Sequence, residues 1–588
     1  WAFAATSSIT SSMSLPISVV WRFSSSGLPY SRKLSANLLT RWISYGNKPG
    51  QGPRPDRTEW LLVEYAEPLA AAGIEHLRSQ PGWDVIVSNP KEYAQHLADS
   101  DALIVRSAVK VTREVLEKAP KLRVIGRAGV GVDNVDLPAA TAAGVLVMNT
   151  PGGNAVSVAE HTLALMLAMA RGIPQASAST KSGKWEKKRF MGNELRDKTL
   201  GVVGLGSIGR EVVKRARAFE MKIVATDPYV SPQVAEDLNV ELVDLARLYA
   251  VSDYISLHVA MTPETKGMLS REAFARMKPG VRLVNCSRGE LIDAEALKEA
   301  IESGKVAGAA LDVFEAEPPA AGYPLFSLDT VVATPHIAGS TEEAQEIVGV
   351  RIAEQLAEYL RSGVAINAVN MPALSPEQYR AVEPYIALAE RLGAFAAHIA
   401  AGNPRTVRLV YLGKIAEINT HLIRNSGLAG VLNRSLSQKA NVVNAMQIAA
   451  QRGLNVAERH EQRTGTMDSV RLELETDAGL TTVEGAVLLG KPRLIQVDGI
   501  YCEAQLSGHL TFIKNLDVPG VIGHVGTVLG HNRINIANFS LGRRDVPLKP
   551  GEPLEAVAVV ETDGIVPESV LAQLRENPAV KLARAVEF

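Results

Sequence analysis

Three residues suited to proton transfer and anion binding follow predicted strands in the middle of the chain. Arg288 occurs in VNCSRGE, Glu317 in ALDVFEAEP and His336 in ATPHIAGST. Open α/β sheets place their chemistry at the carboxyl ends of the strands, so these side chains are expected at one sheet edge. Oxidation of a 2-hydroxy acid needs a base, a group that orients the base, and a cation for the carboxylate. His336, Glu317 and Arg288 suit these tasks in that order, although each taken singly also fits an ordinary structural role.

A glycine-rich turn between a predicted strand and a predicted helix indicates a dinucleotide site. The segment LGVVGLGSIG carries Gly204, Gly206 and Gly209 as GxGxxG, and the helical pattern REVVKRARAF follows. Gly204 permits the tight turn, Gly206 lets the backbone approach a pyrophosphate, and Gly209 lets helix and strand pack closely. Asp227 ends the next predicted strand, where a carboxylate accepts hydrogen bonds from ribose hydroxyls and repels a 2′-phosphate. The predicted cofactor is therefore NAD.

Length, charge and cysteine content narrow the class of protein. A chain of 588 residues is longer than one hydrophobic core usually supports, which predicts several domains. The formal charge of -1 leaves no extended positive field, so nucleic acid is not an expected partner. The two cysteines, Cys286 and Cys502, lie far apart, which indicates a reducing compartment and no cysteine-based metal site. No apolar run reaches the roughly 20 residues of a membrane span, so no membrane association is expected.

The N-terminal segment differs in composition from the rest of the chain. Residues 1–55 contain no Asp or Glu, are rich in Ser and carry scattered Arg and Lys. This composition is typical of an organelle transit peptide, with a chloroplast favoured over a mitochondrion. A disordered tail without a targeting function is the alternative. We therefore predict a transit peptide and linker over residues 1–56.

The remainder reads as two α/β units followed by two smaller units. From Glu59 onward, β-branched runs alternate with helical patterns, which is typical of parallel sheets with helices on both faces. A second such series begins at Lys198. After about Asn370 a Pro-containing linker precedes a mixed helix and strand segment that runs to Gln505. From Leu510 the pattern predicts a β-α-β-β-α-β unit.

Four blocks of the sequence resemble a known family. VVGLGSIGREV, LVNCSRGELIDAEAL, GAALDVFEAEP and TPHIAGSTEEAQ resemble, in order, the signature blocks of the D-isomer-specific 2-hydroxyacid dehydrogenases. The C-terminal extension resembles that of the long-form D-3-phosphoglycerate dehydrogenases within this family. The resemblance implies that Arg288, Glu317 and His336 are the catalytic residues. It also implies further cofactor contacts at Ser207, Ile208, Asp227, Val259, Asp312 and Ala338.

The same resemblance implies a fold and a division into domains. A Rossmann-type doubly wound parallel sheet is inserted in a flavodoxin-like α/β substrate domain, and an α+β intervening domain and a ferredoxin-like ACT domain follow. The substrate-binding domain would comprise residues 57–155 and 343–370, enclosing an NAD-binding domain of residues 156–342. The intervening domain would cover residues 371–507 and the ACT domain residues 508–588.

The resemblance further implies oxidation of 3-phosphoglycerate with NAD, which begins serine synthesis. Arg106 and Arg127 match basic positions that the phosphoglycerate members use on the substrate, and Asn154 lies in the nearby block PGGNAVSVAEH. Some members carry another Arg where this chain has Ala108. The basic run of residues 184–189, reaching from a neighbouring subunit, would replace that anchor unless it is only a solvated loop.

The ACT resemblance implies regulation by a small amino acid. Asn515, Asp517 and Asn535 match positions that hold L-serine in regulated members, although ordinary loop polarity also explains them. ACT modules pair with a copy in another subunit, so a homodimer or homotetramer is expected.

Two other functions share parts of this pattern. A hydroxypyruvate or glyoxylate reductase of the same superfamily would have the same three residues and nucleotide site, but the long C-terminal extension favours the phosphoglycerate assignment. A non-catalytic NAD-sensing scaffold would bind the cofactor without turnover, and the leader and the terminal sensor domain weigh against it. Turnover assays separate the three.

Overall fold

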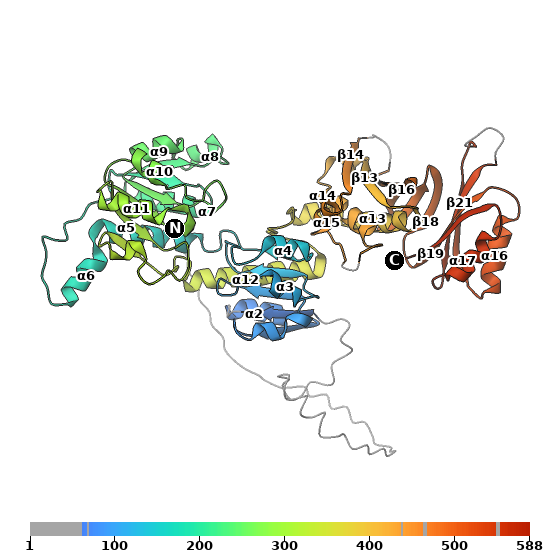
Figure 1. Cartoon of the computed structure of the whole chain (residues 1–588), viewed down its shortest axis with the longest axis horizontal. Helices are drawn as coiled ribbons and strands as arrows, with labels where there is room; N and C mark the ends of the chain where they lie inside the picture. Colours follow the sequence, from blue (N-terminus) through green and yellow to red (C-terminus); the bar gives the residue numbers. More distant parts are fainter. Residues whose placement is uncertain (1–60, 67–69, 437–438, 463–466, 548–552) are drawn as a thin grey trace, which may run out of the picture. The chain divides into compact units, whose positions relative to one another are not determined.

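The computed structural model describes residues 61–66, 70–436, 439–462, 467–547 and 553–588 (Figure 1). The predicted transit peptide and linker, residues 1–56, lie outside the described residues. Within the described part, the chain forms two parallel α/β sheets, then one mixed and one antiparallel sheet. The predicted fold class is confirmed, and the predicted domain boundaries stay predictions.

The first sheet is parallel and has helices on both faces. Its strands are β1 (Leu61–Tyr65), β2 (Trp83–Val87), β3 (Ala102–Val105), β4 (Val124–Arg127) and β5 (Leu146–Met148). The helices are α2 (Ala71–Arg78), α3 (Arg113–Glu117), α4 (Leu137–Ala142) and the distant α12 (Glu342–Ser362). The strand order β2-β1-β3-β4-β5 is that of flavodoxin-like sheets. Ile104 faces the core under α2 and α12, and its neighbours Leu103 and Val105 face the core under α3 and α4.

One carboxylate lies inside this first sheet. Glu64 of β1 is 0% exposed, and its Oε1 accepts a hydrogen bond from the Ser88 hydroxyl. Its Oε2 has no hydrogen-bond partner within the described part of the chain. Burial raises the pKa of Glu64 to about 7, against a smaller lowering by the Ser88 hydrogen bond. The folded state therefore favours the neutral acid.

Replacing Glu64 with Gln is expected to stabilise the first sheet at alkaline pH. The pKa of Glu64 is higher in the folded state than in the unfolded state. The free energy of unfolding is therefore unreduced by Glu64 below about pH 4.5, and it falls as the pH rises through about 7 and the buried group ionises. Gln cannot ionise, so the gain should be on the order of 2 kcal/mol at pH 8.5. Urea unfolding followed by the fluorescence of Trp83, which lies in β2, measures it. An equal gain at pH 5 would contradict the explanation.

The second sheet is the seven-stranded parallel sheet of a Rossmann fold. Its strands are β6 (Thr199–Val203), β7 (Lys222–Thr226), β8 (Glu241–Leu242), β9 (Tyr254–Leu257), β10 (Val281–Asn285), β11 (Val306–Leu311) and β12 (Val331–Ala333). The order β8-β7-β6-β9-β10-β11-β12 is the Rossmann order 3-2-1-4-5-6 with one added strand.

Helices cover both faces of this second sheet. They are α5 (Ala155–Arg171), α7 (Ser207–Ala218), α8 (Pro232–Asp237), α9 (Leu245–Val251), α10 (Arg271–Arg276) and α11 (Ala294–Glu302). Val202 belongs to the core shared with α5 and α7, whereas the adjacent Val203 belongs to the core shared with α9, α10 and α11. The alternation explains why these strands are apolar on both faces.

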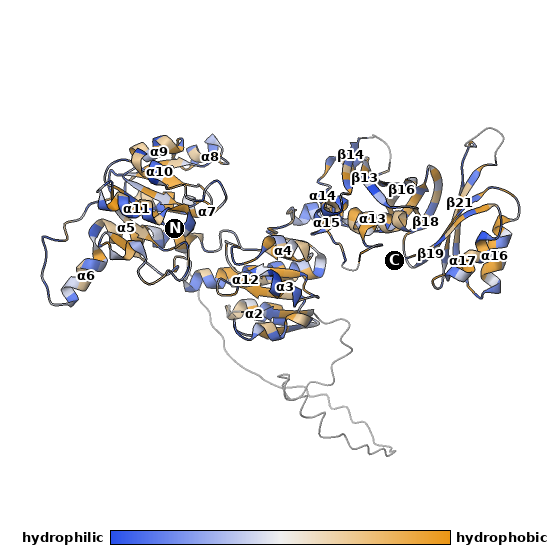
Figure 2. Ribbon diagram, in the orientation of Figure 1, coloured by the Kyte–Doolittle hydropathy of each residue, from blue (hydrophilic) through white to orange (hydrophobic). Residues whose placement is uncertain are grey.

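Two consecutive helices have the length and composition of a bent membrane span. Among the described residues, no single helix combines the length and the apolar composition that crossing a membrane requires. The pair formed by α5 and α6 (Ile173–Lys181), bent by 62°, has the required length and composition. In Figure 2, α5 is mainly orange and α6 mainly blue and white. Val158, Leu163 and Met166 of α5 are buried in the core of the second sheet.

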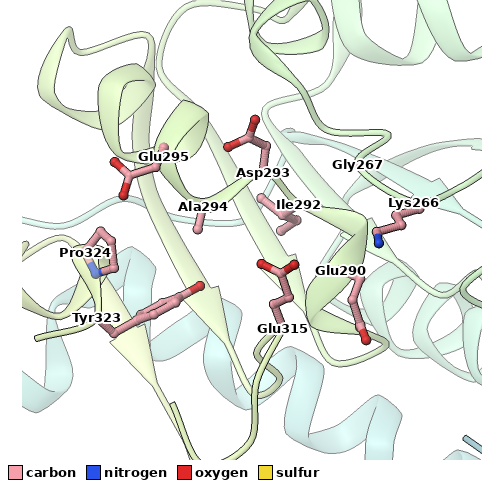
Figure 3. Close-up of a pocket in the computed structure, with 10 residues that line it drawn as sticks. All are labelled: Lys266, Gly267, Glu290, Ile292, Asp293, Ala294, Glu295, Glu315, Tyr323 and Pro324. Atoms are coloured by element: carbon pink, nitrogen blue, oxygen red, sulfur yellow. The ribbon is translucent and has the colours of Figure 1, made fainter. Parts of the chain in front are cut away.

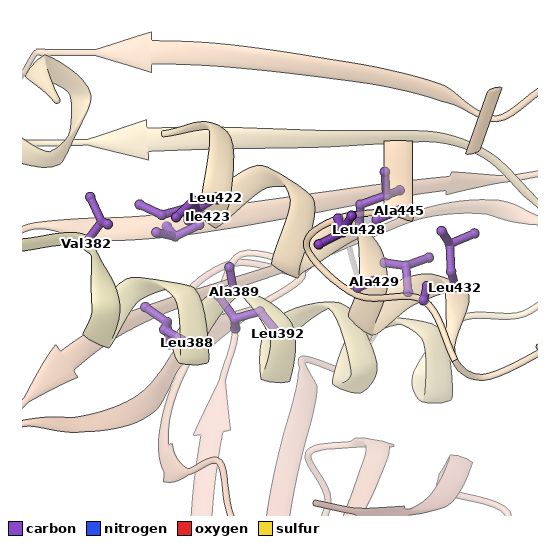
Figure 4. Close-up of a cluster of buried hydrophobic side chains, with 14 of the residues drawn as sticks. Val382, Leu388, Ala389, Leu392, Leu422, Ile423, Leu428, Ala429, Leu432 and Ala445 are labelled. Atoms are coloured by element: carbon purple, nitrogen blue, oxygen red, sulfur yellow. The ribbon is translucent and has the colours of Figure 1, made fainter. Parts of the chain in front are cut away.

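The third sheet is mixed and lies against a long helix. Its strands are β13 (Pro404–Leu412), β14 (Asn455–Glu461), β15 (Ser469–Thr476), β16 (Gly479–Leu488), β17 (Lys491–Val497) and β18 (Ile500–Gln505). The helices are α13 (Pro376–Ile399), α14 (His421–Leu432) and α15 (Ala445–Gln451), with the packing of α13 on α14 shown in Figure 4. A Cβ on Gly393 would lie 2.1 Å from the carbonyl oxygen of Gly427. Glycine at this crossing lets the two helices approach closely.

The last sheet is antiparallel and has two helices on one face. Its strands are β19 (His509–Leu516), β20 (Ile536–Arg543), β21 (Glu555–Thr562) and β22 (Val580–Glu587), and its helices are α16 (Val521–His531) and α17 (Glu568–Arg575). The order β20-β21-β19-β22 is that of a ferredoxin-like unit, as predicted. Val525 and Leu571 anchor the two helices in the core.

Candidate active site

Three neighbouring strands position the predicted catalytic residues. Arg288, Glu317 and His336 follow β10, β11 and β12, which are adjacent in the second sheet. His336 Nδ1 lies 2.6 Å from Glu317 Oε2, and Glu317 Oε1 accepts a hydrogen bond from the Phe314 N–H at 3.1 Å. With Nδ1 engaged, His336 has Nε2 to receive a proton. The structure therefore gives the orienting contact that the sequence predicted for this pair.

The protonation of the pair follows from the same contact. The hydrogen bond and charge of Glu317 raise the pKa of His336 above its usual value, against an opposing contribution from burial. Burial alone would raise the pKa of Glu317, but the hydrogen bonds from His336 and Phe314 outweigh it and lower that pKa. Glu317 is thus an anion that stabilises an imidazolium, which is what a general base needs after it accepts a proton.

The backbone holds His336 in an uncommon conformation. His336 lies in the loop of residues 334–341 between β12 and α12, here called the catalytic loop. Its φ is 53°, in the left-handed region that non-glycine residues rarely adopt. Its N–H donates a hydrogen bond to the Asp312 carbonyl oxygen at 2.8 Å. Such strain at a functional residue persists only where the surrounding structure fixes it.

Arg288 is paired with a carboxylate that the sequence did not single out. Asp133 Oδ2 accepts hydrogen bonds from Arg288 Nη2 at 2.6 Å and from Nε at 2.9 Å. Burial would raise the pKa of Asp133, but the Arg288 hydrogen bond and charge outweigh it and lower that pKa. A Cβ on Gly131 would lie 1.8 Å from Arg288 Nη2, so this glycine makes room for the guanidinium. In the sequence, two glycines precede Asp133 in RAGVGVD, but nothing in that segment identified Arg288 as its partner.

The glycine-rich turn has the geometry of a nucleotide cradle. Gly204 has a φ of 97°, and a Cβ there would lie 2.8 Å from the His258 carbonyl oxygen. A Cβ on Gly209 would lie 2.1 Å from the Gly204 carbonyl oxygen, whereas one on Gly206 would meet nothing within 4 Å. The open space at Gly206 lies at the N-terminus of α7, which has no side-chain cap. Backbone N–H groups at that end suit a pyrophosphate, so the residues present fit NAD.

The other predicted cofactor contacts fall into two groups. Asp227 follows β7, and its two oxygens accept hydrogen bonds from the N–H groups of Leu205 at 2.8 Å and Tyr229 at 2.9 Å. Each oxygen keeps a further lone pair for a ribose hydroxyl. Ser207 and Ile208, in the first turn of α7, lie at the same edge of the sheet. Val259 follows β9.

Asp312 and Ala338 lie beneath the catalytic loop. The Asp312 carboxylate is 0% exposed, and its Oδ2 accepts a hydrogen bond from the Ala338 N–H at 2.9 Å. Ala338 is itself buried. The structure thus shows these two predicted cofactor residues bound to each other.

Two of the predicted substrate residues, Arg106 and Arg127, lie at one edge of the first sheet. Arg106 follows β3, and Arg127 is the last residue of the adjacent strand β4. The charge of Arg127 helps lower the pKa of Asp133, which is the partner of Arg288. Asn154 precedes α5, and a Cβ on Gly339 would lie 2.8 Å from its Nδ2. Asn154 is therefore packed against the catalytic loop.

The basic run of residues 184–189 is exposed except at Glu186. Its Arg189 pairs with Asp329 at 3.3 Å and with Glu186 at 3.4 Å. Lys184, Lys187 and Lys188 are exposed. The position of the family's further arginine is taken by Ala108, which is also exposed.

A pocket among the described residues of the second sheet and its helices does not contain the predicted catalytic residues. It has a volume of about 430 Å³ and includes Lys266, Glu290, Asp293, Glu295 and Glu315 in its lining. Figure 3 shows these side chains, with the Tyr323 ring on the side of the opening away from Lys266. Four carboxylates around one cation repel a phosphorylated acid, so this pocket is not the substrate site.

A second pocket in the last sheet brings together two of the three predicted effector residues. Asn515 and Asp517 line a pocket of about 330 Å³ at the start of α16. Asn535 does not line it, and its Nδ2 donates a hydrogen bond to Asp563 Oδ2 at 3.0 Å. Asp517 Oδ2 lies 3.4 Å from Arg543 Nη1. Most of the remaining lining is apolar.

Three family profiles match successive parts of the chain. Residues 163–338 match the NAD-binding domain of D-isomer specific 2-hydroxyacid dehydrogenases. Residues 381–498 match the D-3-phosphoglycerate dehydrogenase intervening domain, and residues 509–579 match the ACT domain. These profiles agree with the predicted resemblance in both identity and order.

Curated relatives match most of the chain. A D-3-phosphoglycerate dehydrogenase of Methanocaldococcus jannaschii is 46% identical over 492 residues, covering 84% of this chain and 93% of the relative. One of Archaeoglobus fulgidus is 42% identical over 532 residues, covering 90% and 100% respectively. The chloroplastic D-3-phosphoglycerate dehydrogenase 2 of Arabidopsis thaliana is 41% identical over 497 residues, covering 81% and 80%. With the site geometry, these matches show that the chain is an NAD-dependent dehydrogenase and belongs to the D-3-phosphoglycerate dehydrogenase family.

Proposed function

We propose that the protein oxidises 3-phospho-D-glycerate to 3-phosphohydroxypyruvate with NAD, the first step of the phosphorylated route to L-serine. The observation that carries the proposal is the 2.6 Å contact of His336 with Glu317 on strands adjacent to that of Arg288. This arrangement supplies a base, its partner and a cation in a member of the D-3-phosphoglycerate dehydrogenase family.

Each side chain has one task in this reaction. The neutral His336 Nε2 accepts the proton of the substrate hydroxyl, while Nδ1 keeps its hydrogen bond to Glu317. Glu317 stabilises the resulting imidazolium. Arg288 leaves Asp133 and binds the substrate carboxylate through its planar fork. NAD, when bound at the glycine-rich turn, supplies the acceptor for the hydride that leaves the substrate.

The phosphate needs further cations. We assign binding of the substrate phosphate to Arg106 and Arg127, which lie at one edge of the first sheet. Asn154, beside the catalytic loop, is assigned to the substrate with them. The exposed Lys187 and Lys188 would add positive charge from a neighbouring subunit in place of the arginine that Ala108 replaces. Charge-assisted hydrogen bonds of this kind favour a phosphorylated over an unphosphorylated acid.

Formation of NADH by the purified chain without residues 1–56 tests the proposal. Turnover is expected with 3-phosphoglycerate and should be much weaker with D-glycerate. Activity confined to D-glycerate, or to reduction of hydroxypyruvate or glyoxylate, would instead establish a reductase for unphosphorylated acids. Binding of NADH without turnover of any of these acids would establish a cofactor-sensing scaffold.

Cofactor choice should depend on the charge of Asp227. Replacing Asp227 with Ser removes the carboxylate that repels a 2′-phosphate, so kcat/KM with NADP relative to NAD is expected to rise about tenfold or more. Asp227→Asn is the matched control for lost support of the glycine-rich turn, because its amide oxygen still accepts from Leu205. Steady-state kinetics with both cofactors measure the ratio. An unchanged ratio in both variants would show that Asp227 does not select the cofactor.

Regulation, assembly and location complete the proposal. We assign L-serine to the pocket lined by Asn515 and Asp517, with Asn535 contributed by a second copy in a homodimer or homotetramer. Calorimetric titration of the full chain with serine tests this, and valine is the comparison because the lining is mostly apolar.

Two relatives are named chloroplastic, and the composition of residues 1–55 supports the chloroplast as the location. Import of a fluorescent fusion into isolated chloroplasts tests the leader.

A further inference from the structure

A chain of hydrogen bonds runs from α5 to the buried carboxylate beneath the catalytic loop. His161 of α5 places its Nε2 at 3.1 Å from Thr334 Oγ1 and at 3.5 Å from Asp312 Oδ1. Thr334 Oγ1 in turn lies 2.6 Å from Asp312 Oδ1. The N–H groups of Ile337 and Ala338 donate to the same carboxylate, each at 2.9 Å.

The directions of these hydrogen bonds are determined by the carboxylate. Burial alone would raise the pKa of Asp312, but its hydrogen bonds outweigh burial and lower that pKa, so the group is an anion and only accepts. The single hydroxyl proton of Thr334 therefore points to Asp312. His161 must then donate its Nε2 proton to Thr334. Nε2 of His161 therefore carries a proton in this arrangement.

This chain of hydrogen bonds ends at the catalytic base. The side chain of Asp312 binds the backbone on the C-terminal side of His336, and its carbonyl oxygen accepts the His336 N–H at 2.8 Å. Asp312 thus holds the strained residue from both directions. Any displacement of Asp312 would change the position of His336 Nδ1 relative to Glu317.

We propose that His161 and Thr334 are positioning residues for the dehydrogenase reaction, because they anchor Asp312 and, through it, the loop that presents His336. The inference rests on the proposed function for its kinetic test, but not for its structural test. Neither residue touches the reacting atoms. Their contribution is to keep His336 in contact with Glu317 at the distance required for proton transfer.

The test compares His161→Leu, which removes the donor, with His161→Gln, which keeps a nitrogen donor at the end of the side chain. Loss of the donor is expected to lower kcat about 10-fold to 100-fold with little change in the KM for NAD, and Gln should restore most of the rate. Thr334→Val should resemble His161→Leu, and combining the two should add little further loss, since they belong to one chain of hydrogen bonds. Glu160→Gln is the matched control, because Glu160 is on the same helix and pairs instead with Arg215.

A second readout does not need turnover. Hydrogen–deuterium exchange at the histidine C2 position reports the titration of His336, whose charged surroundings are Glu317, Asp312 and Arg288. In His161→Leu the midpoint is expected to move to lower pH, because the weakened contact with Glu317 no longer favours the imidazolium. A variant that is merely less stable would keep the wild-type midpoint.

The outcomes separate this inference from the proposed function. If the wild type is inactive on 3-phosphoglycerate but the His336 midpoint still moves in His161→Leu, the proposed function fails and the positioning role stands. If the wild type is active and His161→Leu retains both its kcat and its midpoint, the positioning role is wrong. An equal loss in His161→Leu, His161→Gln and Glu160→Gln would also overturn it, because it would indicate general damage to α5.

Discussion

Replacing His336 with Ala is expected to lower kcat for phosphoglycerate oxidation about 1000-fold, within the range that general bases contribute. The alanine variant lacks the nitrogen that accepts the hydroxyl proton, whereas the glycine-rich turn that binds NAD is untouched. Steady-state formation of NADH measures the loss. Binding of NADH, followed by its fluorescence, is expected to match the wild type. A loss of only a few-fold would show that another group is the base.

The pH dependence of the wild type gives an independent check. Oxidation needs the neutral imidazole, and the contact with Glu317 holds the pKa of His336 above 6.5. The rate should therefore fall as the pH drops through a midpoint above that value. In Glu317→Gln the midpoint should move to lower pH, since the carboxylate that stabilises the imidazolium is gone. If the midpoint does not move in this variant, the observed ionisation is not that of His336 paired with Glu317.

Replacing Arg288 with Ala is expected to lower kcat/KM for the hydroxy acid about 100-fold. The variant loses charge-assisted hydrogen bonds to the substrate carboxylate, each worth about 1.5–3 kcal/mol. Most of the loss should appear as a higher KM, and binding of NADH should change little. Arg288→Lys keeps the charge without the planar fork, so it should recover only part of the loss.

Asp133→Asn is the matched control for the arginine variants. It removes the present partner of Arg288 and leaves the guanidinium in place. If Arg288 binds the substrate, this variant should keep or lower the KM for the hydroxy acid. A rise in KM as large as that of Arg288→Ala would indicate that the ion pair, and not the free guanidinium, serves the reaction.

The sequence predicted those features that depend on short, local patterns. The turn from Gly204 to Gly209 was predictable from local sequence, because Gly204 and Gly209 each leave room for a nearby backbone carbonyl, whereas Gly206 leaves open space at the start of α7. The pairing of Glu317 with His336 was also predictable, because consecutive parallel strands bring their ends together. The ferredoxin-like order of the last sheet followed from the sequence of its elements in the same way.

Contacts between distant segments were not predictable from the sequence. Asp133 and Arg288 are 155 positions apart, and nothing local in either segment identifies the other. His161 was not singled out in the sequence, because its role depends on Thr334, 173 positions away. The strands β16, β17 and β18 were not predicted individually, since the third sheet forms by pairing that the pattern of apolar residues does not specify.

In the free enzyme, the carboxylate of Asp133 competes with the substrate carboxylate for Arg288. A carboxylate of the chain occupies the guanidinium where the proposed function puts the carboxylate of the substrate. Exchange of one carboxylate for another leaves the number of anions paired with Arg288 unchanged, so binding of that part of the substrate should depend weakly on ionic strength. The salt dependence of KM would then report mainly on the phosphate end of the molecule.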